Sequence, residues 1–424
     1  MARWNTIARG AALVGVASLA LAACSTGSEG EESPAPGGGT DSEPLKIGTF
    51  LPVTGSLASL GPPEIAGVRL AIQEINDAGG VFGAPVELVE TDSSDANNAS
   101  VGIAAAASLI ADDVDAIIGA ASSSVTLNVI DDVAAAGIVM VSPANTSTTL
   151  SGYSEYYFRT APPDFAQGKV VAGVIAEDGH DQVAVLVQND DYGTSFRDVF
   201  AGHVEENGGT ITYGSAGQEI DPAATNFSTD VQAALATNPT AILMIAFDQT
   251  TQIIPELIAS GFPADGIYMT DGNTQSYADV FDPGTLEGAK GTIPGAAASE
   301  DLFAAASALW EETEGEPLVD ASYLPEAYDA VMLVALAALK GGGADSDLIK
   351  DNMAAVSGSN GGTECSTWVE CSELILAGEE IAYQAKSGAG AFDANNDPST
   401  ALVGVFKYGA DNVPTRFSEF AWES

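Results

Sequence analysis

Two neighbouring stretches decide the fold, LKIGTFLP at residues 45–52 and PPEIAGVRLAIQEINDAGG at residues 62–80. The first is short and apolar and ends in turn residues, which is typical of a buried β-strand. The second has apolar residues near helical spacing at Ile65, Val68, Leu70, Ile72 and Ile75. Its prolines suit the start of a helix and its glycines suit the end. The pair therefore predicts a strand followed by an amphipathic helix.

The same alternation continues along the chain in two series. In the first series, strand-like segments at 85–92, 114–120 and 138–144 alternate with helical segments at 97–113 and 122–137. The second series has helical segments at 165–179, 195–209, 227–238 and 250–261 and strand-like segments at 182–190, 210–217, 241–247 and 266–272. Strands that alternate with helices of this length predict parallel sheets with crossover helices. Two series predict two α/β lobes.

Charge limits the choice of partner. The 424 residues include 59 acidic and 13 basic side chains, which gives a formal net charge of −46. Such a surface repels phosphate groups, so we expect no nucleic-acid partner. A cationic ligand would suit the charge, but we interpret the acids mainly as a solvated coat, because ligand preference is set in a cleft.

The N-terminal segment has the features of an export signal. An apolar run at 11–23 follows two arginines and is shorter than the roughly 20 residues needed to span a bilayer. The run LAAC at 21–24 resembles the lipobox of bacterial lipoproteins, which implies cleavage before Cys24 and a diacylglycerol on its thiol. We predict a signal peptide at 1–23 and a lipidated, disordered tether at 24–43, which would anchor the protein to the outer face of the cytoplasmic membrane. An ordinary secretory signal is the alternative.

Two further cysteines lie close together in GTECSTWVECSEL at 362–374. An exported protein meets oxidising conditions, so a disulfide between Cys365 and Cys371 is expected. In the chain-entropy model, a disulfide that closes so small a loop stabilises the folded state by about 2 kcal/mol. Zinc binding is disfavoured because no histidine is near and the spacing is not CxxC.

The usual catalytic and metal-binding motifs are missing from the sequence, which has no GxSxG, HExxH or GxxxxGK[ST]. His180 lies in a predicted turn and His203 on a predicted helix, and we expect both to be solvated. The stretch at 392–404 begins like a calcium loop but has Pro398 where the loop needs glycine and Gly404 where it needs glutamate, so we interpret it as a hairpin turn. We expect no enzyme activity, cofactor or metal; a surface hydrolase that uses cleft acids is the alternative.

In open α/β sheets, ligands bind beyond the carboxyl ends of the strands. The segments at these ends are LPVTGSLASLG (51–61), GAASSS (119–124), SPANT (142–146), QNDDYG (188–193), AFDQT (246–250) and MTDGN (269–273). The binding residues are therefore to be sought in these six segments.

Six longer motifs carry a family resemblance: IGTFLPVTGSLASLG (47–61), AIQEINDAGGVFGAPVELVETD (71–92), IIGAASSSVT (117–126), VMVSPANTS (139–147), YYFRTAPPDFAQG (156–168) and NDDYGTSF (189–196). Together they resemble the branched-chain amino-acid-binding proteins of ABC importers, which are type I periplasmic binding proteins. The resemblance covers about residues 45–340 and implies two Rossmann-like lobes with parallel central sheets, joined by a three-strand hinge.

The resemblance also implies domain limits and a place for the ligand. The hinge crossings are expected at 160–163, 293–294 and 386–392. Lobe 1 then comprises 44–162 plus 294–386, and lobe 2 comprises 163–293 plus 387–424. The ligand is expected between the lobes, which close on it.

The family's residue roles can be carried to matching positions. Ser123, beside Ser124, stands where a serine grips the ligand α-carboxylate. The Asn145 carbonyl and the Thr146 hydroxyl stand where the ligand ammonium is bound, and Asp271 replaces a family glutamate that pairs with this ammonium. Each also has a structural interpretation, as a helix cap, a capped loop or an Asp-Gly turn.

Three more positions are expected to wall the pocket. Tyr192 matches an aromatic that packs over the ligand, and Phe247 is a further aromatic wall. Leu60 stands where the family often has a large aromatic, so the pocket shape differs. The implied function is capture of an amino acid, branched-chain or related, for delivery to an ABC permease. A ligand sensor of the same fold and a binder of urea or short amides are the alternatives.

Overall fold

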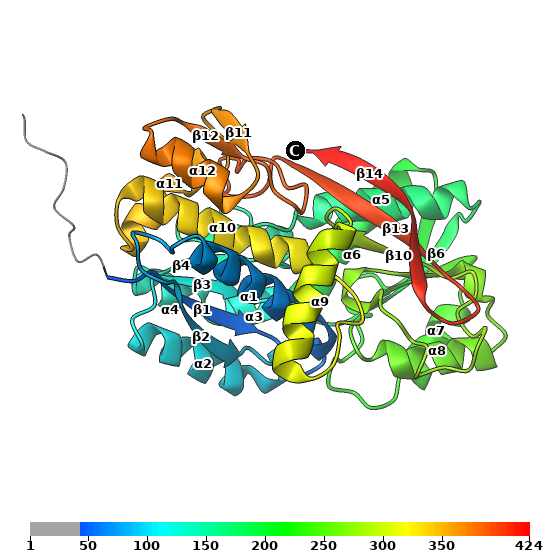
Figure 1. The fold of residues 1–424 in the computed structure, drawn as a ribbon. Helices are drawn as coiled ribbons and strands as arrows, with labels where there is room; N and C mark the ends of the chain where they lie inside the picture. The colour runs from blue at the N-terminus through cyan, green and yellow to red at the C-terminus, as the bar shows by residue number, and fades with distance from the viewer. Residues whose placement is uncertain (1–42) are drawn as a thin grey trace, which may run out of the picture. The chain divides into compact units, whose positions relative to one another are not determined.

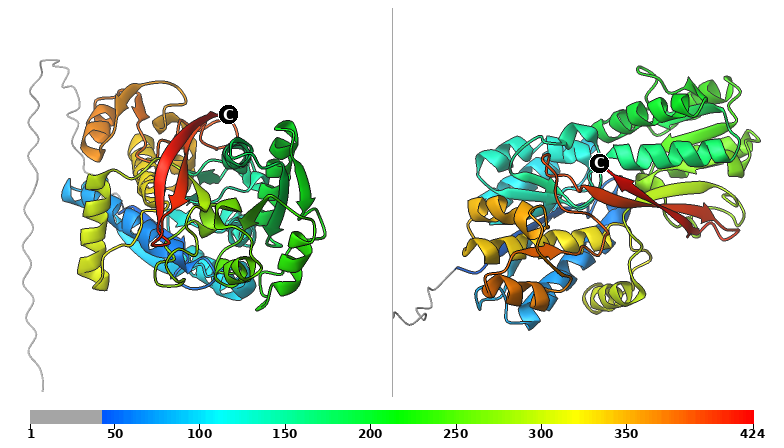
Figure 2. Two further views of the ribbon diagram at one scale, coloured as in Figure 1. Left: turned by 90° about the vertical axis from the view of Figure 1, so that its right-hand side faces the viewer. Right: turned by 90° about the horizontal axis from the view of Figure 1, so that it is seen from above.

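A computed structural model describes residues 43–424. The predicted signal peptide at 1–23, the lipidation site Cys24 and all of the tether but its last residue lie outside the described residues. The described chain forms two lobes, each built on its own β-sheet (Figures 1 and 2). This architecture confirms the predicted fold class.

Lobe 1 is built on a five-stranded sheet in the order β2-β1-β3-β4-β5, in which all neighbouring strands are parallel. Its strands are β1 (Lys46–Leu51), β2 (Glu87–Asp92), β3 (Ala116–Gly119), β4 (Val139–Ser142) and β5 (Tyr157–Arg159). Its helices are α1 (Gly61–Asp77), α2 (Ala99–Ala111), α3 (Ser123–Leu127), α4 (Ile130–Ala135), α9 (Glu300–Glu314), α10 (Leu324–Gly341), α11 (Ser346–Val356) and α12 (Trp368–Leu376). Helices α1 and α10 lie side by side and supply much of the lobe 1 core.

Lobe 2 is built on a seven-stranded sheet in the order β14-β13-β10-β9-β8-β6-β7. Its strands are β6 (Gln182–Val187), β7 (Thr210–Tyr213), β8 (Ala241–Ile245), β9 (Ile267–Met269), β10 (Lys290–Pro294), β13 (Thr400–Tyr408) and β14 (Pro414–Glu423). Its helices are α5 (Asp164–Glu177), α6 (Asp191–Glu206), α7 (Ser228–Leu235) and α8 (Thr250–Ala259). The sheet is parallel except at β13 and β14, which pair antiparallel.

The remaining elements are short. Five 3₁₀ turns are η1 (Ala58–Leu60), η2 (Ala96–Asn98), η3 (Thr148–Leu150), η4 (Ala264–Gly266) and η5 (Asp271–Asn273). Strands β11 (Thr363–Cys365) and β12 (Ile381–Tyr383) form a separate parallel pair. No single helix within residues 43–424 is long and apolar enough to cross a membrane; α10 and α11 meet that test only as a pair bent by 108°.

The strands and helices predicted up to residue 272 are present, with one correction. The segment 122–137, predicted as one helix, forms two helices, α3 and α4. Between them, the amide of Val129 donates to the Thr126 carbonyl in a tight turn, and Val129 leaves the helical region. Asparagine and β-branched residues at this point are poor helix formers, and the spacing of apolar residues alone does not reveal the break.

The third hinge crossing, predicted at 386–392, is followed by residues that contact lobe 1. Phe392 belongs to lobe 2 in the predicted limits, but its ring centroid lies 5.2 Å from that of Phe158 in lobe 1. Arg159 Nε donates to Asp397 Oδ1 at 2.6 Å. We therefore propose that lobe 2 resumes at Thr400, where β13 begins.

Two local predictions are confirmed. Cys365 and Cys371 form a disulfide with a Cα–Cα distance of 5.3 Å, which joins β11 to α12. An antiparallel bridge between Phe392 and Pro398 closes the predicted hairpin turn. The Asp393 carboxylate stabilises this turn by accepting hydrogen bonds from the backbone N–H groups of Asn395 and Asp397.

Candidate functional site

A small cavity lies between the two lobes at the carboxyl ends of their strands, with about 240 Å³ of space outside the atoms, open solvent included. Lobe 1 contributes Leu57, Leu60, Ala121, Ser122, Ser123 and Ala144, and lobe 2 contributes Tyr192, Phe247, Asp271 and Gly272. Every one of these residues lies a short distance after a strand. The cavity therefore lies in the region that the sequence analysis pointed to, and it includes five of the eight predicted ligand-binding residues.

The three consecutive serines have different surroundings. Ser123 Oγ accepts the backbone N–H of Ser147 at 3.3 Å, and Ser124 Oγ accepts that of Asp191, in lobe 2, at 2.9 Å. Ser122 Oγ is buried and has no hydrogen-bond partner among the described residues. Ser122 is therefore the serine at the cavity whose hydroxyl makes no other hydrogen bond. Sequence reasoning missed it because a run of serines does not show which member faces inward.

Asp271 lies in η5 directly after β9 and connects the two lobes. Its Oδ1 accepts the hydroxyl of Tyr192 at 2.8 Å, and its Oδ2 accepts that of Tyr323 at 2.7 Å. Burial raises the pKa of Asp271, while the hydrogen bonds from the two tyrosines oppose this rise. Both oxygens keep lone pairs for a further donor. The carboxylate is thus held in place where a ligand group can meet it.

Tyr323 was not anticipated from the sequence. It precedes α10 in lobe 1, is 2 % exposed and has a φ of 58°, which is rare for a bulky side chain. Its hydroxyl reaches Asp271 from the opposite lobe. No motif marks this contact, because the two residues are far apart in the chain and meet only when the lobes are close.

The aromatic wall comes from lobe 2. The rings of Tyr192 and Phe247 are stacked, with centroids 5.5 Å apart and planes 15° apart. Gly272 allows this arrangement, because an added Cβ would lie 2.6 Å from the Phe247 ring. Leu57 and Leu60 face this wall from lobe 1. One part of the cavity is therefore apolar and suited to an aliphatic or aromatic group.

Asn145 does not line the cavity. Its Nδ2 donates to the Ala120 carbonyl at 2.9 Å, and its Oδ1 accepts the Thr126 hydroxyl at 2.7 Å. Its own carbonyl accepts Arg159 Nη1 at 3.2 Å. Asn145 therefore holds neighbouring loops together, and the residue of this segment that reaches the cavity is Ala144. The predicted residue, Asn145, and the observed one, Ala144, are adjacent in the chain, and a short motif does not show which of the two faces the cavity.

Thr146 and Asp164 are bonded neighbours, and the cavity residue Asp271 is near Asp164. The Asp164 amide donates to the Thr146 carbonyl at 2.7 Å, and Asp164 Oδ2 accepts the Ser195 hydroxyl at 2.9 Å. Burial raises the pKa of Asp164 to about 7, and the nearby Asp271 adds to the rise. Thr146 Oγ1 and Asp164 Oδ1 are buried without a hydrogen bond of normal geometry. Asp164 was not predicted as a site residue from the sequence.

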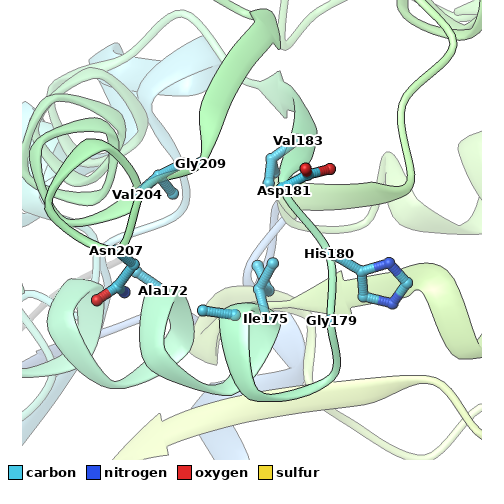
Figure 3. Close-up of a pocket in the computed structure, with 10 residues that line it drawn as sticks. Ala172, Ile175, Gly179, His180, Asp181, Val183, Val204, Asn207 and Gly209 are labelled. Atoms are coloured by element: carbon cyan, nitrogen blue, oxygen red, sulfur yellow. The ribbon is translucent and has the colours of Figure 1, made fainter.

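A second pocket, with an empty volume of about 470 Å³, lies elsewhere in lobe 2 (Figure 3). Its lining includes Ile175, His180, Val183 and Asn207, from the ends of α5 and α6 and the start of β6. It is therefore at the amino ends of the strands, away from the usual ligand position. His180 contacts Tyr268 edge-on there, with ring centroids 5.9 Å apart.

His203 pairs with Glu206 on the exposed side of α6. No group of three or more His, Cys, Asp or Glu side chains within 43–424 is arranged to hold a metal ion. Acid, hydroxyl and apolar groups converge in the interlobe cavity.

Sequence comparisons place this architecture among known proteins. Residues 44–371 match the model of the family described as "Periplasmic binding protein". The chain is similar to the Leu/Ile/Val-binding protein homolog 3 of Brucella melitensis, with 30% identity over 187 residues, or 43% of this chain and 49% of that protein. It is also similar to the chemotactic signal transduction system substrate-binding protein BasB of Halobacterium salinarum, with 26% identity over 86% of each chain. The first alignment thus spans about half of that relative's length.

Solved structures share the fold. The leucine-binding protein LivK of Thermotoga maritima superposes with a TM-score of 0.71 and 22% identity, over 89% of this chain and 98% of that chain. LivJ of Streptococcus pneumoniae, in complex with isoleucine, superposes with a TM-score of 0.71 and 21% identity, over 90% of this chain and 100% of that chain. A Rhodopseudomonas palustris solute-binding protein, in complex with 4-hydroxybenzoate, superposes with a TM-score of 0.72 and 19% identity, over 89% of this chain and 97% of that chain. The chain therefore belongs to the periplasmic binding protein family and has the type I fold of that family.

Proposed function

We propose that this protein captures an amino acid between its lobes as the solute-binding component of a branched-chain amino-acid ABC importer. The observation that carries the proposal is the polarity of the cavity. A carboxylate, Asp271, lies on one lobe and serine hydroxyls, Ser122 and Ser123, lie on the other. An amino acid carries complementary groups, an ammonium and a carboxylate on one carbon.

Each part of the ligand has a matching surface. The ammonium pairs with Asp271, and the α-carboxylate accepts hydrogen bonds from Ser122 and Ser123. The side chain lies between Phe247 and Leu60, in the apolar part of the cavity. Capture of this kind involves no covalent step, and it agrees with relatives that are named as binding proteins.

Delivery and location extend the proposal. Names of relatives, such as the leucine-, isoleucine-, valine-, threonine-, and alanine-binding protein of Pseudomonas aeruginosa, support an amino-acid cargo. A permease partner and an extracytoplasmic location follow from the importer role. The export signal at 1–23 and the lipid on Cys24 are inferred from sequence and would keep the protein close to its permease.

The ligand class is tested by thermal denaturation of the protein with each of the twenty amino acids, urea, short amides and benzoate. A ligand that binds only the folded state adds about 2.7 kcal/mol at a hundredfold excess over Kd. We expect an amino acid with an apolar side chain to give the largest rise in Tm. Rises with benzoate or amides alone would contradict the proposed zwitterion site.

Asp271→Asn tests the polarity of the site. Loss of a charged partner for the ammonium predicts that Kd rises about 10- to 100-fold in calorimetric titration. Asp132→Asn, at an exposed position on α4, is the matched control and leaves Kd unchanged. Equal Kd values for Asp271→Asn and the unmodified protein would refute the assignment.

A second candidate function is ligand sensing. It is favoured by the similarity to BasB, which is named as a substrate-binding protein of a chemotactic signal transduction system and is covered over 86% of its length. Uptake of the radiolabelled amino acid by cells with and without the gene separates the two roles. A gene deletion that leaves uptake intact and abolishes a response to the amino acid would favour sensing.

A further inference from the structure

A second pocket between the lobes lies where β10 is followed by α9, and we call it the hinge pocket. It has about 1070 Å³ of space outside the atoms, open solvent included. Lobe 1 lines it with α9, the start of α10 and the loop 319–323, and lobe 2 lines it with β10, β13, β14 and residues 274–276 (Figure 1). It shares no lining residue with the interlobe cavity, so it is a separate place for a ligand.

The walls of the hinge pocket are largely apolar. Phe303 of α9 and Val319 line it from lobe 1, and Phe406 and Pro414 line it from lobe 2. Val319 is 86 % exposed, so this wall is uncovered by the described chain. A ligand that removes such a surface from water gains free energy. The walls therefore suit an aliphatic or aromatic body, as is usual in small-molecule sites.

A buried carboxyl group forms one polar end of the pocket. Glu326 on α10 is 1 % exposed and lines the pocket beside Gly295. Besides its own backbone N–H, no group among the described residues donates to its Oε1. Gly295 leaves room for the carboxyl, because an added Cβ would overlap Oε1. Buried polar atoms almost always have partners, so this oxygen marks a place for a hydrogen-bonding group.

A donor approaches the same glycine from the other lobe. Arg416 on β14 donates from Nη2 to the Gly295 carbonyl at 2.7 Å, and Nη2 lies 3.1 Å from a carboxylate oxygen of Glu419. Its Nε is buried and has no hydrogen-bond partner among the described residues. Glu326 and Arg416 therefore meet at Gly295, and each keeps one unused hydrogen-bonding atom.

These two atoms define the end group of a ligand. A primary carboxamide has a carbonyl that can accept from Arg416 and an amide nitrogen that can donate to Glu326. A charged end group fits less well. A cation would be repelled by Arg416, and an anion by Glu300 and Asp320, which also line the pocket.

We propose that the hinge pocket is a second ligand site, which binds a neutral molecule with an apolar body and a primary carboxamide held between Glu326 and Arg416. A molecule bound there contacts both lobes outside the interlobe cavity. The proposal goes beyond the proposed function and does not rest on it.

Benzamide is the probe that tests this site. Ligand-observed NMR titration of the protein gives its Kd, and competition against benzamide gives those of N,N-dimethylbenzamide and benzoate. We expect N,N-dimethylbenzamide, which cannot donate a hydrogen bond, and the anionic benzoate each to bind about tenfold more weakly than benzamide. Saturation with the amino acid that gives the largest thermal shift should not displace benzamide.

Two variants locate the probe. Ala297→Trp places a large side chain at an exposed position of the pocket lining, and it should abolish benzamide binding. Ala135→Trp, at an exposed position on α4 outside the pocket, is the matched control and should leave Kd unchanged. Glu326→Met keeps a similar shape without the acceptor, so benzamide should lose its preference over N,N-dimethylbenzamide. We expect this variant to fold, because an apolar residue of similar volume can replace a buried charge.

Each outcome bears on the proposal. It is overturned if benzamide does not bind up to its limit of solubility, or if the amino acid displaces it. Binding that Ala297→Trp leaves unchanged overturns it too, because the probe is then elsewhere. A preference for benzamide that persists in Glu326→Met contradicts the role of Glu326, and if that variant does not fold, the Kd values and Ala297→Trp decide. The proposed function fails separately, when no amino acid binds.

Discussion

At the residue scale, buried carboxyl groups are a feature of this protein beyond the binding site. Glu64 on α1 is fully buried, and neither of its carboxyl oxygens has a hydrogen-bond partner among the described residues. Burial raises its pKa well above the ordinary value, and the buried Glu326 adds to the rise. Burial of this kind favours the protonated form in the folded protein, and it makes the free energy of unfolding depend on pH.

Glu64→Gln tests this dependence. The folded protein holds a proton on Glu64 that the unfolded chain releases above about pH 4, so the free energy of unfolding falls as pH rises from there toward the raised folded pKa. Glutamine removes the titration. We expect urea denaturation to show greater stability of the variant relative to the unmodified protein at pH 8 than at pH 5.

The exposed Glu87 on β2 gives the control, because Glu87→Gln removes an acid without changing a buried group. Its effect on the free energy of unfolding is expected to stay within about 0.5 kcal/mol at both pH values. A Glu64→Gln variant with the same pH profile as the unmodified protein would mean that Glu64 is ionised in the folded state.

At the element scale, Arg159 joins β5 to two loops. Its side chain is fully buried and donates to Asp397 of the hinge segment, to the Ser147 carbonyl and to the Ser151 hydroxyl. The first contact holds the third crossing against lobe 1. The others fix the loop that contains Ala144 and Thr146. One side chain thus connects the hinge with the ligand-binding edge of lobe 1.

Arg159→Met is expected to reduce the free energy of unfolding by about 3–5 kcal/mol, because the Asp397 carboxylate is left buried without its partner. The double variant Arg159→Met/Asp397→Leu removes both charges and should recover part of this loss. Urea denaturation of both variants measures the difference. If the double variant is no more stable than the single one, the loss comes from packing and from the loop, and the uncompensated charge is not its cause.

The elements also show what sequence can predict. The strands and helices up to residue 272 follow from apolar spacing and turn residues, and the resemblance located five of the ten residues that line the cavity. Ser122 and Ala144 differ from the predicted residues by one position, because short motifs define a loop but not which side chain points inward. Tyr323 and Asp164 depend on contacts between lobes and on burial, which a linear pattern does not contain.

At the scale of the whole molecule, three side-chain contacts, together with a hydrogen bond from the Asp248 amide to the Ser56 carbonyl, hold the lobes together around the cavity. Ser124 Oγ accepts the Asp191 amide at 2.9 Å. Ser195 Oγ lies 2.9 Å from the Thr148 amide and 3.0 Å from its hydroxyl. The Tyr323 hydroxyl donates to Asp271. Closure therefore has its own contacts besides those that a ligand would add. The net charge of −46 produces electrostatic repulsion that opposes a compact state. These contacts and the ligand must therefore offset this repulsion when the lobes close.

Tyr323→Phe tests the contribution of one such contact. The change removes the hydroxyl that bridges the lobes and keeps the ring and its place before α10. A hydrogen bond to a charged group contributes about 1.5–3 kcal/mol, so the closed state should lose roughly 10- to 100-fold in population relative to the open state. We expect small-angle scattering of the ligand-free variant to give a larger radius of gyration than that of the unmodified protein.

The ligand then distinguishes a shifted equilibrium from a damaged site. A ligand that binds mainly the closed state must first overcome the lost closure energy, so Kd rises by the factor by which the closed population falls. At saturation, however, the radius of gyration should return to the value of the unmodified protein. Tyr153→Phe, which removes an exposed hydroxyl bonded to Asp131, should change neither quantity. A Tyr323→Phe variant that stays equally compact without ligand and binds equally well would show that Asp271 and Tyr323 meet without stabilising closure.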